Sequence, residues 1–166
     1  MPEIPAPADR ATIEEVWRTR WGLPICTPTG NWMPEDVQGL VLIRAEFPIG
    51  LVTWRVTGDE AEVVTLNVLE GARSGHGTRL LQSAEQAVRR LGATRVFLYT
   101  SNDNLRAVGF YQKRGFRLVR VHPDAVEGFR KVKPSIPASG EDGIPLLDSW
   151  ELSKCLAVAQ ASRGAV

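Results

Sequence analysis

The chain has 166 residues, and its 20 Lys and Arg residues nearly balance its 19 Asp and Glu residues, which leaves a formal net charge of +1. This length predicts one domain with a substantial core, and the balanced charge argues against binding to nucleic acid through a basic surface. The sequence carries no apolar run of membrane-spanning length, no signal-peptide pattern and only two cysteines, so we expect a cytoplasmic protein without a disulfide framework.

A helix is predicted near the N-terminus, after the Pro- and Ala-rich residues 1–8, which we expect to fray. The pattern Thr12-Ile13-Glu14-Glu15 is a capping box that would begin this helix, and Gly22 would end it. Residues 24–34 are then expected to form a loop.

Three β-rich segments follow and favour an antiparallel meander. Gln38–Glu46 and Leu51–Thr57 indicate a hairpin whose strands are joined by Phe47-Pro48-Ile49-Gly50. A tight turn at Gly58-Asp59-Glu60 leads into the third strand, Ala61–Leu69. These three strands are expected to form the sheet on which the next helix packs.

The next helix, 78–91, is predicted from apolar residues that recur on one face, namely Leu80, Leu81, Ala84, Ala87, Val88 and Leu91. The connection from strand 61–69 through this helix to a strand at 95–101 should be parallel and right-handed.

Beyond that strand, the sequence predicts a helix at 104–114 and strands at 117–122 and 149–154. The segment between the last two strands is rich in Pro and Gly, and loops of this length in compact domains are usually functional or disordered. Residues 157–166 are small and polar and are expected to form a disordered tail, so the domain would span residues 1–156.

A glycine-rich turn that begins at Gly71 joins strand 61–69 to the helix that follows. The start of a helix has unpaired N–H groups and the positive end of the helix dipole, and Gly75 and Gly77 let a ligand approach the backbone closely. Because Arg73 adds a cation, the turn predicts a phosphate or pyrophosphate site.

Two familiar phosphate loops do not fit the spacing of this turn. A P-loop needs its second glycine where the chain has His76, and a dinucleotide fingerprint needs a third glycine where the chain has Leu80. A glycine-rich turn without any ligand is the alternative.

A second stretch, Asn104–Phe116, lies beyond the next strand, and with the glycine-rich turn it resembles the GNAT superfamily of N-acetyltransferases. The family's acetyl-CoA loop reads Gln/Arg-x-x-Gly-x-Gly/Ala, and here Gly75 and Gly77 match, whereas Ala72 stands where Gln or Arg is usual. The resemblance covers residues 37–122 well. The family's later helix reads Asn-x-x-Ala-x-x-Phe-Tyr-x-x-x-Gly-Phe, and the matching residues are Asn104, Ala107, Phe110, Tyr111, Gly115 and Phe116.

The resemblance implies an α/β (α+β) fold with a mixed, mostly antiparallel central sheet and helices on both faces. Its parallel strands 61–69 and 95–101 would splay apart to admit the pantetheine arm of acetyl-CoA. It also implies transfer of an acetyl group from acetyl-CoA to a primary amine, on a small molecule or a peptide, by a protein that could form a homodimer.

The same resemblance places the cofactor largely on backbone groups. The N–H groups of the turn would hold the pyrophosphate, namely those of Arg73, Ser74, Gly75, His76, Gly77 and Thr78. A backbone N–H at the end of the preceding strand would polarise the thioester carbonyl, and the candidates are Asn67, Val68 and Leu69. The Asn104 amide would bond the pantetheine arm or the facing strand. No metal is expected, because His76 and His122 are isolated from the cysteines in sequence.

Tyr111 is the candidate general acid that protonates the leaving thiolate. Asn104, Val108 and Tyr111 share one helical stripe, and a phenol with a pKa of about 10 is protonated at neutral pH. The alternative is a Tyr that is buried in the core with its hydroxyl satisfied nearby.

Glu62 is the candidate base, because it begins the strand that leads into the site and could take the amine proton directly or through water. A solvated carboxylate at a strand end is the alternative. Asp103 is expected to cap the helix at 104–114, and His76 is expected to contribute its backbone rather than act as the base.

The expected reaction is direct attack of the amine on acetyl-CoA in a ternary complex, because neither Cys26 nor Cys155 falls in a matched motif. A catalytically inactive acetyl-CoA sensor is the rival interpretation, which Ala72 favours, and a scaffold protein without a ligand is a third. Residues 20–36 and 123–147 are expected to build the acceptor site, and neither carries a pattern that identifies the amine.

Overall fold

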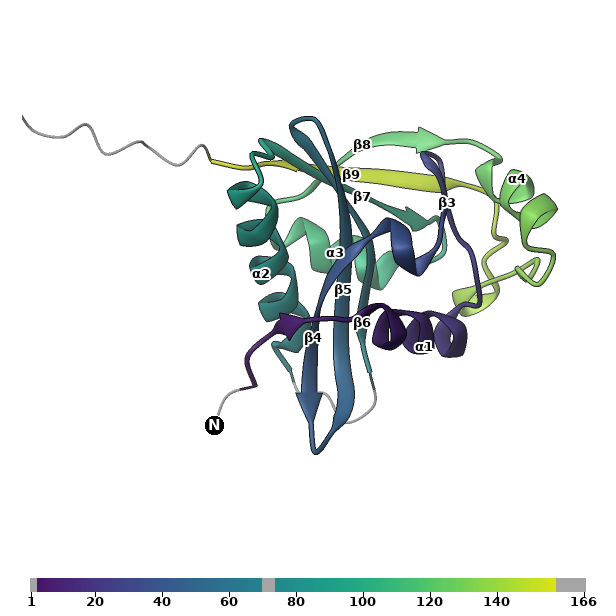
Figure 1. The fold of residues 1–166 in the computed structure, drawn as a ribbon. Helices are drawn as coiled ribbons and strands as arrows, with labels where there is room; N and C mark the ends of the chain where they lie inside the picture. The colour runs from purple at the N-terminus through teal and green to yellow at the C-terminus, as the bar shows by residue number, and fades with distance from the viewer. Residues whose placement is uncertain (1–2, 70–73, 158–166) are drawn as a thin grey trace, which may run out of the picture.

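The computed structural model describes residues 3–69 and 74–157, and seven of its strands form one mixed sheet (Figure 1). These strands are β1 (Ala6–Pro7), β4 (Gln38–Arg44), β5 (Phe47–Thr57), β6 (Glu60–Val68), β7 (Arg95–Ser101), β8 (Arg117–His122) and β9 (Ser149–Cys155). Their order in the sheet is β1-β4-β5-β6-β7-β9-β8, and neighbours are antiparallel except β6 and β7, which run parallel. The expected mixed, mostly antiparallel sheet is confirmed.

The helices and a small hairpin surround this sheet. The helices are α1 (Arg10–Arg20), α2 (His76–Arg90), α3 (Leu105–Gln112) and α4 (Ala125–Val132), with single 3-10 turns at η1 (Pro34–Asp36) and η2 (Glu141–Gly143). The hairpin consists of β2 (Ile25–Thr27) and β3 (Gly30–Trp32). None of the helices within residues 3–69 and 74–157 is both long and apolar enough to cross a membrane. The expectations for Arg73 and for a tail beyond residue 157 lie outside the described residues.

Apolar side chains pack on both faces of the sheet. On one face, α2 and α3 share a core with the strands that includes Leu80, Leu81 and Tyr111. On the other face, α1 packs Ile13 and Trp17 into a second core. The expected helices on both faces are therefore confirmed, and Figure 1 shows α1 in front of the strands and α3 behind them.

The N-terminal helix begins one turn earlier than its capping-box pattern predicts. Asp9 is the N-cap, since its carboxylate accepts a hydrogen bond of 2.8 Å from the backbone N–H of Thr12. Because that N–H is already bonded to Asp9, Thr12 lies inside the helix, and the predicted cap at Thr12 is wrong. The fraying expected for residues 1–8 is also wrong for residues 3–8, because β1 pairs with β4 and Glu3 forms an ion pair with Arg44.

The hairpin turn between β4 and β5 lies two residues before its expected position. Ala45 and Glu46 form the turn with φ angles of 47° and 70°, and Arg44 pairs with Phe47 across it. Two left-handed residues match the twist of the flanking strands, so this short turn closes the hairpin. The predicted join at residues 47–50 is wrong, since these residues belong to β5, and Pro48 is accommodated beside an irregularity in the strand pairing.

The parallel strands β6 and β7 separate as the resemblance implied. Their pairing covers only Glu60–Val63 of β6 with Arg95–Leu98 of β7, although both strands continue further. Val64 is the cause on the β6 side: Trp54 pairs with Val63 but Thr53 pairs with Thr65, so Val64 is an extra residue in the ladder. A bulge of this kind bends the strand, which turns the end of β6 away from β7.

Candidate active site

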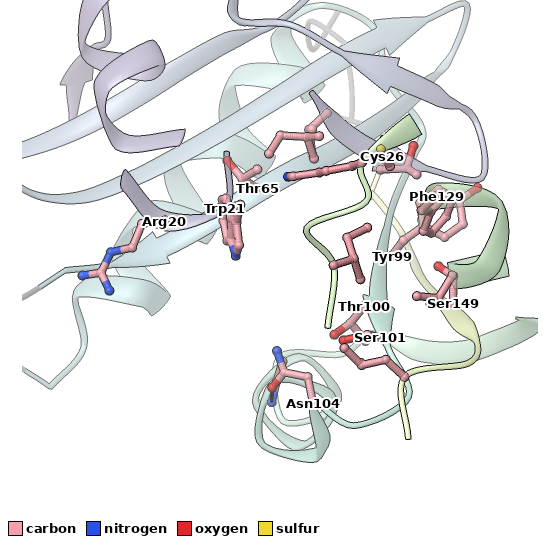
Figure 2. A pocket seen from close by; sticks show the side chains of 18 of the residues that line it. Arg20, Trp21, Cys26, Thr65, Tyr99, Thr100, Ser101, Asn104, Phe129 and Ser149 are labelled. Atoms are coloured by element: carbon pink, nitrogen blue, oxygen red, sulfur yellow. Dashed lines mark hydrogen bonds between the residues drawn. The ribbon is translucent and has the colours of Figure 1, made fainter. Parts of the chain in front are cut away.

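The separated ends of β6 and β7 border a cavity of about 790 Å³. Besides these strands, its lining comes from α3, from the end of α1 through β2, and from α4 and the segment that follows it up to the start of β9. Figure 2 shows Trp21 on one side of the opening and Asn104 on the other, with Tyr99, Thr100 and Ser101 along β7. Parts of segments 20–36 and 123–147, which were expected to build an acceptor site, therefore do line this cavity.

The segment between β8 and β9 contains α4 and η2, and polar contacts hold it in place. Near its middle, the Lys133 ammonium donates to the carbonyl oxygens of Gly22 and Pro24, at 3.0 and 3.1 Å. At its C-terminal end, the Asn102 side-chain carbonyl oxygen accepts the backbone N–H of Leu147 at 3.0 Å. These contacts fix the segment as a wall of the cavity, so the disordered alternative is wrong here.

Tyr111 lies on α3, where its ring belongs to the core and its residue also lines the cavity. The residue is 8% exposed, and its ring packs edge-to-face against Phe110 and Phe116, with centroid distances of 5.2 and 5.5 Å. No group in the described part of the chain hydrogen-bonds to the hydroxyl. Burial raises the pKa of Tyr111 above its ordinary value, so the phenol stays protonated and can donate.

Asn104 is the N-cap of α3, because its side-chain oxygen accepts the N–H of Ala107 at 3.1 Å. The amide nitrogen can still donate, so capping is compatible with a contact to a ligand in the cavity that Asn104 lines. Asp103 does not cap this helix, which corrects the expectation. Its buried carboxylate instead accepts a hydrogen bond from the hydroxyl of Ser101 and another from the backbone N–H of Glu141.

The glycine-rich turn leads directly into α2. Gly75 is the N-cap, with a φ of 93° that a side chain rarely adopts, and His76, Gly77 and Thr78 form the first turn. A Cβ on Gly77 would lie 3.2 Å from a methyl carbon of Val68, so this glycine also lets α2 pack closely on β6. The first-turn N–H groups lack partners within the helix, as an anion site requires.

Two side-chain contacts support the first turn of α2. The buried His76 ring lies 3.4 Å from the Glu3 carboxylate, away from the cavity. Arg114, which sequence reasoning missed, donates to the Thr78 hydroxyl at 2.9 Å and stacks over the ring of Phe110 at 3.6 Å. Arg114 occupies a variable position inside the Asn104–Phe116 motif, so only its basic character could have drawn attention to it.

The end of β6 presents its backbone N–H groups alternately to β5 and to the cavity. The Leu69 N–H donates to the Ile49 carbonyl at 3.0 Å, so it is already used. Successive backbone N–H groups of an antiparallel strand point to opposite edges of that strand. The Asn67 N–H therefore also points to β5, whereas the N–H groups of Val68 and Leu66 point to the gap between β6 and β7. Leu66 lines the cavity and was missed by the sequence, since the bulge that sets this register carries no sequence signal.

Glu62 is 2% exposed, so the alternative of a solvated carboxylate is wrong. Glu62 is not among the described residues that line the cavity, but the hydroxyl groups of Thr29 and Thr27 connect it to the cavity. Thr29 donates to the Glu62 carboxylate at 2.7 Å, and the hydroxyls of Thr29 and Thr27 lie 2.9 Å apart. Thr27 lines the cavity.

Burial is the main reason that the pKa of Glu62 is raised, although Thr29 and Arg55 oppose the shift. The Arg55 guanidinium lies 3.6 Å from the carboxylate and stacks over the ring of Trp32. One carboxylate oxygen of Glu62 has no hydrogen-bond partner in the described part of the chain. A buried carboxylate with an unused oxygen and a raised pKa has the character of a general base.

Residues 3–69 and 74–157 contain no group of three or more His, Cys, Asp or Glu side chains that could hold a metal ion.

The sheet is mixed, its one parallel pair splays apart, and a helix that begins at a glycine connects the two parallel strands. This arrangement is the α+β fold of the GNAT acetyltransferases. Residues 11–116 match the model of the acetyltransferase (GNAT) family, and the chain belongs to this family.

The chain is also similar to two relatives from one organism and to a solved structure. YxbD of Bacillus subtilis (strain 168) is 35% identical over 157 residues, which cover 93% of this chain and 96% of the relative. YdhI of the same organism is 32% identical over 146 residues, which cover 87% and 91%. The crystal structure of a GNAT family acetyltransferase from Elizabethkingia anophelis with acetyl-CoA bound has a TM-score of 0.64 at 20% identity, over 74% of this chain and 78% of that one. At this identity the structural match supports the fold alone.

Proposed function

We propose that this protein transfers an acetyl group from acetyl-CoA to a primary amine by direct attack in a ternary complex. One observation carries the proposal: the Tyr111 hydroxyl has no partner in the described part of the chain and belongs to a residue that lines the cavity between the splayed strands. Buried polar groups are normally satisfied, so a hydroxyl that has no protein partner and belongs to a cavity-lining residue is available to a ligand.

The cofactor would enter between β6 and β7, with its pyrophosphate at the first turn of α2. Ser74, Gly75, His76, Gly77 and Thr78 offer backbone N–H groups at this helix start, and Arg114 brings a positive charge to the side chain of Thr78. Arg73 is proposed on its sequence position alone. Asn104 would donate its amide N–H to the pantetheine arm.

The thioester carbonyl would be polarised by the end of β6. The N–H groups of Val68 and Leu66 are the donors that strand alternation directs to the opening, so we assign this role to them rather than to Asn67 or Leu69. The amine nitrogen then bonds to the acetyl carbon, the C–S bond breaks, and the leaving thiolate takes the proton of Tyr111.

The amine proton would reach Glu62 through the two threonine hydroxyls. Thr27 accepts the proton from the amine and passes its own hydroxyl proton to Thr29, which passes its proton to the Glu62 carboxylate. The result is one neutral carboxylic acid and one phenolate, which return to their starting states by exchange with water. This path gives a buried carboxylate outside the cavity a role in catalysis.

The rival function, an acetyl-CoA sensor without turnover, shares the cofactor site but needs neither Tyr111 nor Glu62. The test is to measure acetyl-CoA binding by calorimetry and free CoA release with a panel of primary amines. The proposal expects tight binding and amine-dependent release. Binding without release for every amine would favour the sensor, and no binding would remove the cofactor site altogether.

The proton path has its own test in the pH dependence of kcat/KM. The base must be deprotonated, so activity should rise with pH through the pKa of Glu62. Thr29→Val removes a hydrogen bond that lowers this pKa, so the acid limb should move to higher pH, and kcat should fall by about a hundredfold if the relay is the main proton path. Thr94→Val, which removes an exposed hydroxyl outside the cavity, is the matched control. An unchanged profile for Thr29→Val would remove Glu62 as the base.

A further inference from the structure

The part of the cavity on the α1 and α4 side, which we call the acceptor chamber, has both apolar and polar groups in its walls. Its apolar lining comes from Trp21, Ile25, Val126, Phe129, Ile136 and Leu146. Trp21 is 43% exposed, so a large aromatic face is available at the opening (Figure 2). Apolar surface of this kind contributes about 25 cal/mol per Å² when a ligand covers it.

The charges around the chamber are unbalanced. Arg18, Arg20 and Lys133 line the cavity, and Arg18 is paired with Glu14 at 2.7 Å, whereas Asp148 is the one carboxylate among the described lining residues. One oxygen of Asp148 accepts the backbone N–H of Asp124 at 2.9 Å. A second positive charge on a bound amine would therefore meet more cationic than anionic side chains on these walls.

Two buried carboxylates, Glu62 and Glu151, do not change this balance, because neither lines the cavity and each lies close to a basic side chain. Glu62 is held by Thr29 and Arg55. The Glu151 carboxylate accepts hydrogen bonds from the Arg95 guanidinium at 2.8 Å and from the His122 ring at 3.0 Å, and Glu151 does not line the cavity.

The positive charge of Lys133 directly disfavours a second cation in the chamber. Its ammonium is fixed inside the wall by the carbonyl oxygens of Gly22 and Pro24, and burial lowers the pKa of Lys133 because its charge is poorly solvated. An ammonium group brought beside it would be repelled and would lose its own hydration without a counter-ion.

We infer that the acceptor is a primary monoamine with an aromatic or branched apolar body and no second cationic group. This inference rests on the proposed acetyl transfer, and it specifies the substrate class of that same site. The apolar body would lie against the walls that include Trp21 and Phe129, with the amine directed to Thr27 and the acetyl carbon. Polyamines, aminoglycosides and lysine-rich peptides are disfavoured by the same walls.

The test compares rigid amines that differ in one charge. Benzylamine and para-xylylenediamine share an aromatic ring, and the diamine adds a second ammonium that cannot fold back to solvent. We expect kcat/KM for benzylamine to be about tenfold or more above that for the diamine, since an unpaired buried cation costs at least the ~1.4 kcal/mol that a factor of ten represents. Spermidine should be poorer still, and butylamine should lie below benzylamine because it covers less apolar surface.

Two variants locate the preference in the chamber. Lys133→Gln keeps a donor for the carbonyls of Gly22 and Pro24 but removes the charge, so the ratio of benzylamine to diamine activity should fall several-fold. Lys131→Gln is the matched control, because Lys131 is exposed on the same helix and does not line the cavity, and its ratio should stay at the wild-type value. Phe129→Asp, which adds a carboxylate, should move the preference toward the diamine.

The outcomes separate the two levels of the proposal. Acetyl-CoA binding without CoA release for any amine would remove the transferase itself. Release that is faster with para-xylylenediamine or spermidine than with benzylamine would keep the transferase and overturn the acceptor class. An unchanged ratio in both Lys133→Gln and Phe129→Asp would also overturn it, because the chamber would then not be where the amine binds.

Discussion

Replacing Tyr111 by Phe removes one hydroxyl and leaves the surrounding structure intact. The ring contacts with Phe110 and Phe116 do not involve the oxygen, and no group in the described part of the chain is left without a partner. Since deleting a polar atom that has no protein partner breaks no hydrogen bond, the free energy of unfolding should change by less than about 1 kcal/mol. Acetyl-CoA affinity should also stay within about twofold, because the hydroxyl acts on the leaving thiolate rather than on the bound thioester.

The effect on the chemical step should be large. General acid catalysis contributes about a hundredfold or more, which corresponds to about 2.7 kcal/mol of transition-state stabilisation. Because burial raises the pKa of Tyr111, the phenol remains protonated across the usual assay range, and the loss should be the same at pH 7 and pH 9.

The assay is single-turnover release of CoA with a saturating amine, so that slow product release cannot mask the chemical step. Calorimetry with acetyl-CoA and a thermal melt of the same preparation serve as controls for binding and folding. Thr94→Val, which deletes an exposed hydroxyl outside the cavity, should behave like wild type. If Tyr111→Phe turns over at the wild-type rate under these conditions, Tyr111 is a core residue and another group protonates the thiolate.

Three further outcomes follow from the same structure. Cys26→Ala and Cys155→Ala should both remain active, with intersecting rather than parallel double-reciprocal plots, and a trapped acetyl-enzyme would contradict direct attack. Gly140→Ala should raise KM for the amine and leave acetyl-CoA binding intact, because the added Cβ would overlap the Asp103 carboxylate and displace the wall segment; an unchanged KM would show that this contact is not needed. A backbone hydrogen bond and the Arg44 guanidinium lower the pKa of Glu3 to about 2, so the stability that this carboxylate provides is present above its ordinary pKa and is lost as the pH falls toward 2. Urea melts of Glu3→Gln should therefore differ from wild type near pH 6 and converge near pH 2, and a constant difference would refute the linkage.

The sequence predicted most of the regular elements because their apolar residues follow simple periods. The stripe that includes Leu80, Leu81 and Ala84 is buried on α2, and the strand at 61–69 corresponds to β6. The turn at Gly58 also holds, with a φ of 61° that favours glycine.

Turns without glycine were less predictable. Phe47-Pro48-Ile49-Gly50 has the composition of a turn, yet the hairpin turns at Ala45 and Glu46, which carry no such signal. The bulge at Val64 also carries no sequence signal, because valine is typical of any strand. Its consequence, the separation of β6 and β7, was expected only through the resemblance to a family.

The polar contacts of the site were beyond sequence reasoning because they join distant parts of the chain. Thr29 is 33 residues from Glu62, and Lys133 is 111 residues from Gly22. Motifs predicted Tyr111 and Asn104, and the sheet register decides which backbone N–H groups of β6 face the cavity, which the linear pattern could not show.

The proposed function depends on movement of an acetyl group from the thioester of acetyl-CoA onto an amine. The most direct measurement incubates the protein with isotopically labelled acetyl-CoA and benzylamine, then quantifies free CoA and labelled N-acetylbenzylamine by mass spectrometry. Both products should accumulate in equal amounts, and Tyr111→Phe should slow their formation together. Acetyl-CoA that binds in calorimetry but leaves no labelled amide with benzylamine or any other amine would contradict the proposed acetyl transfer.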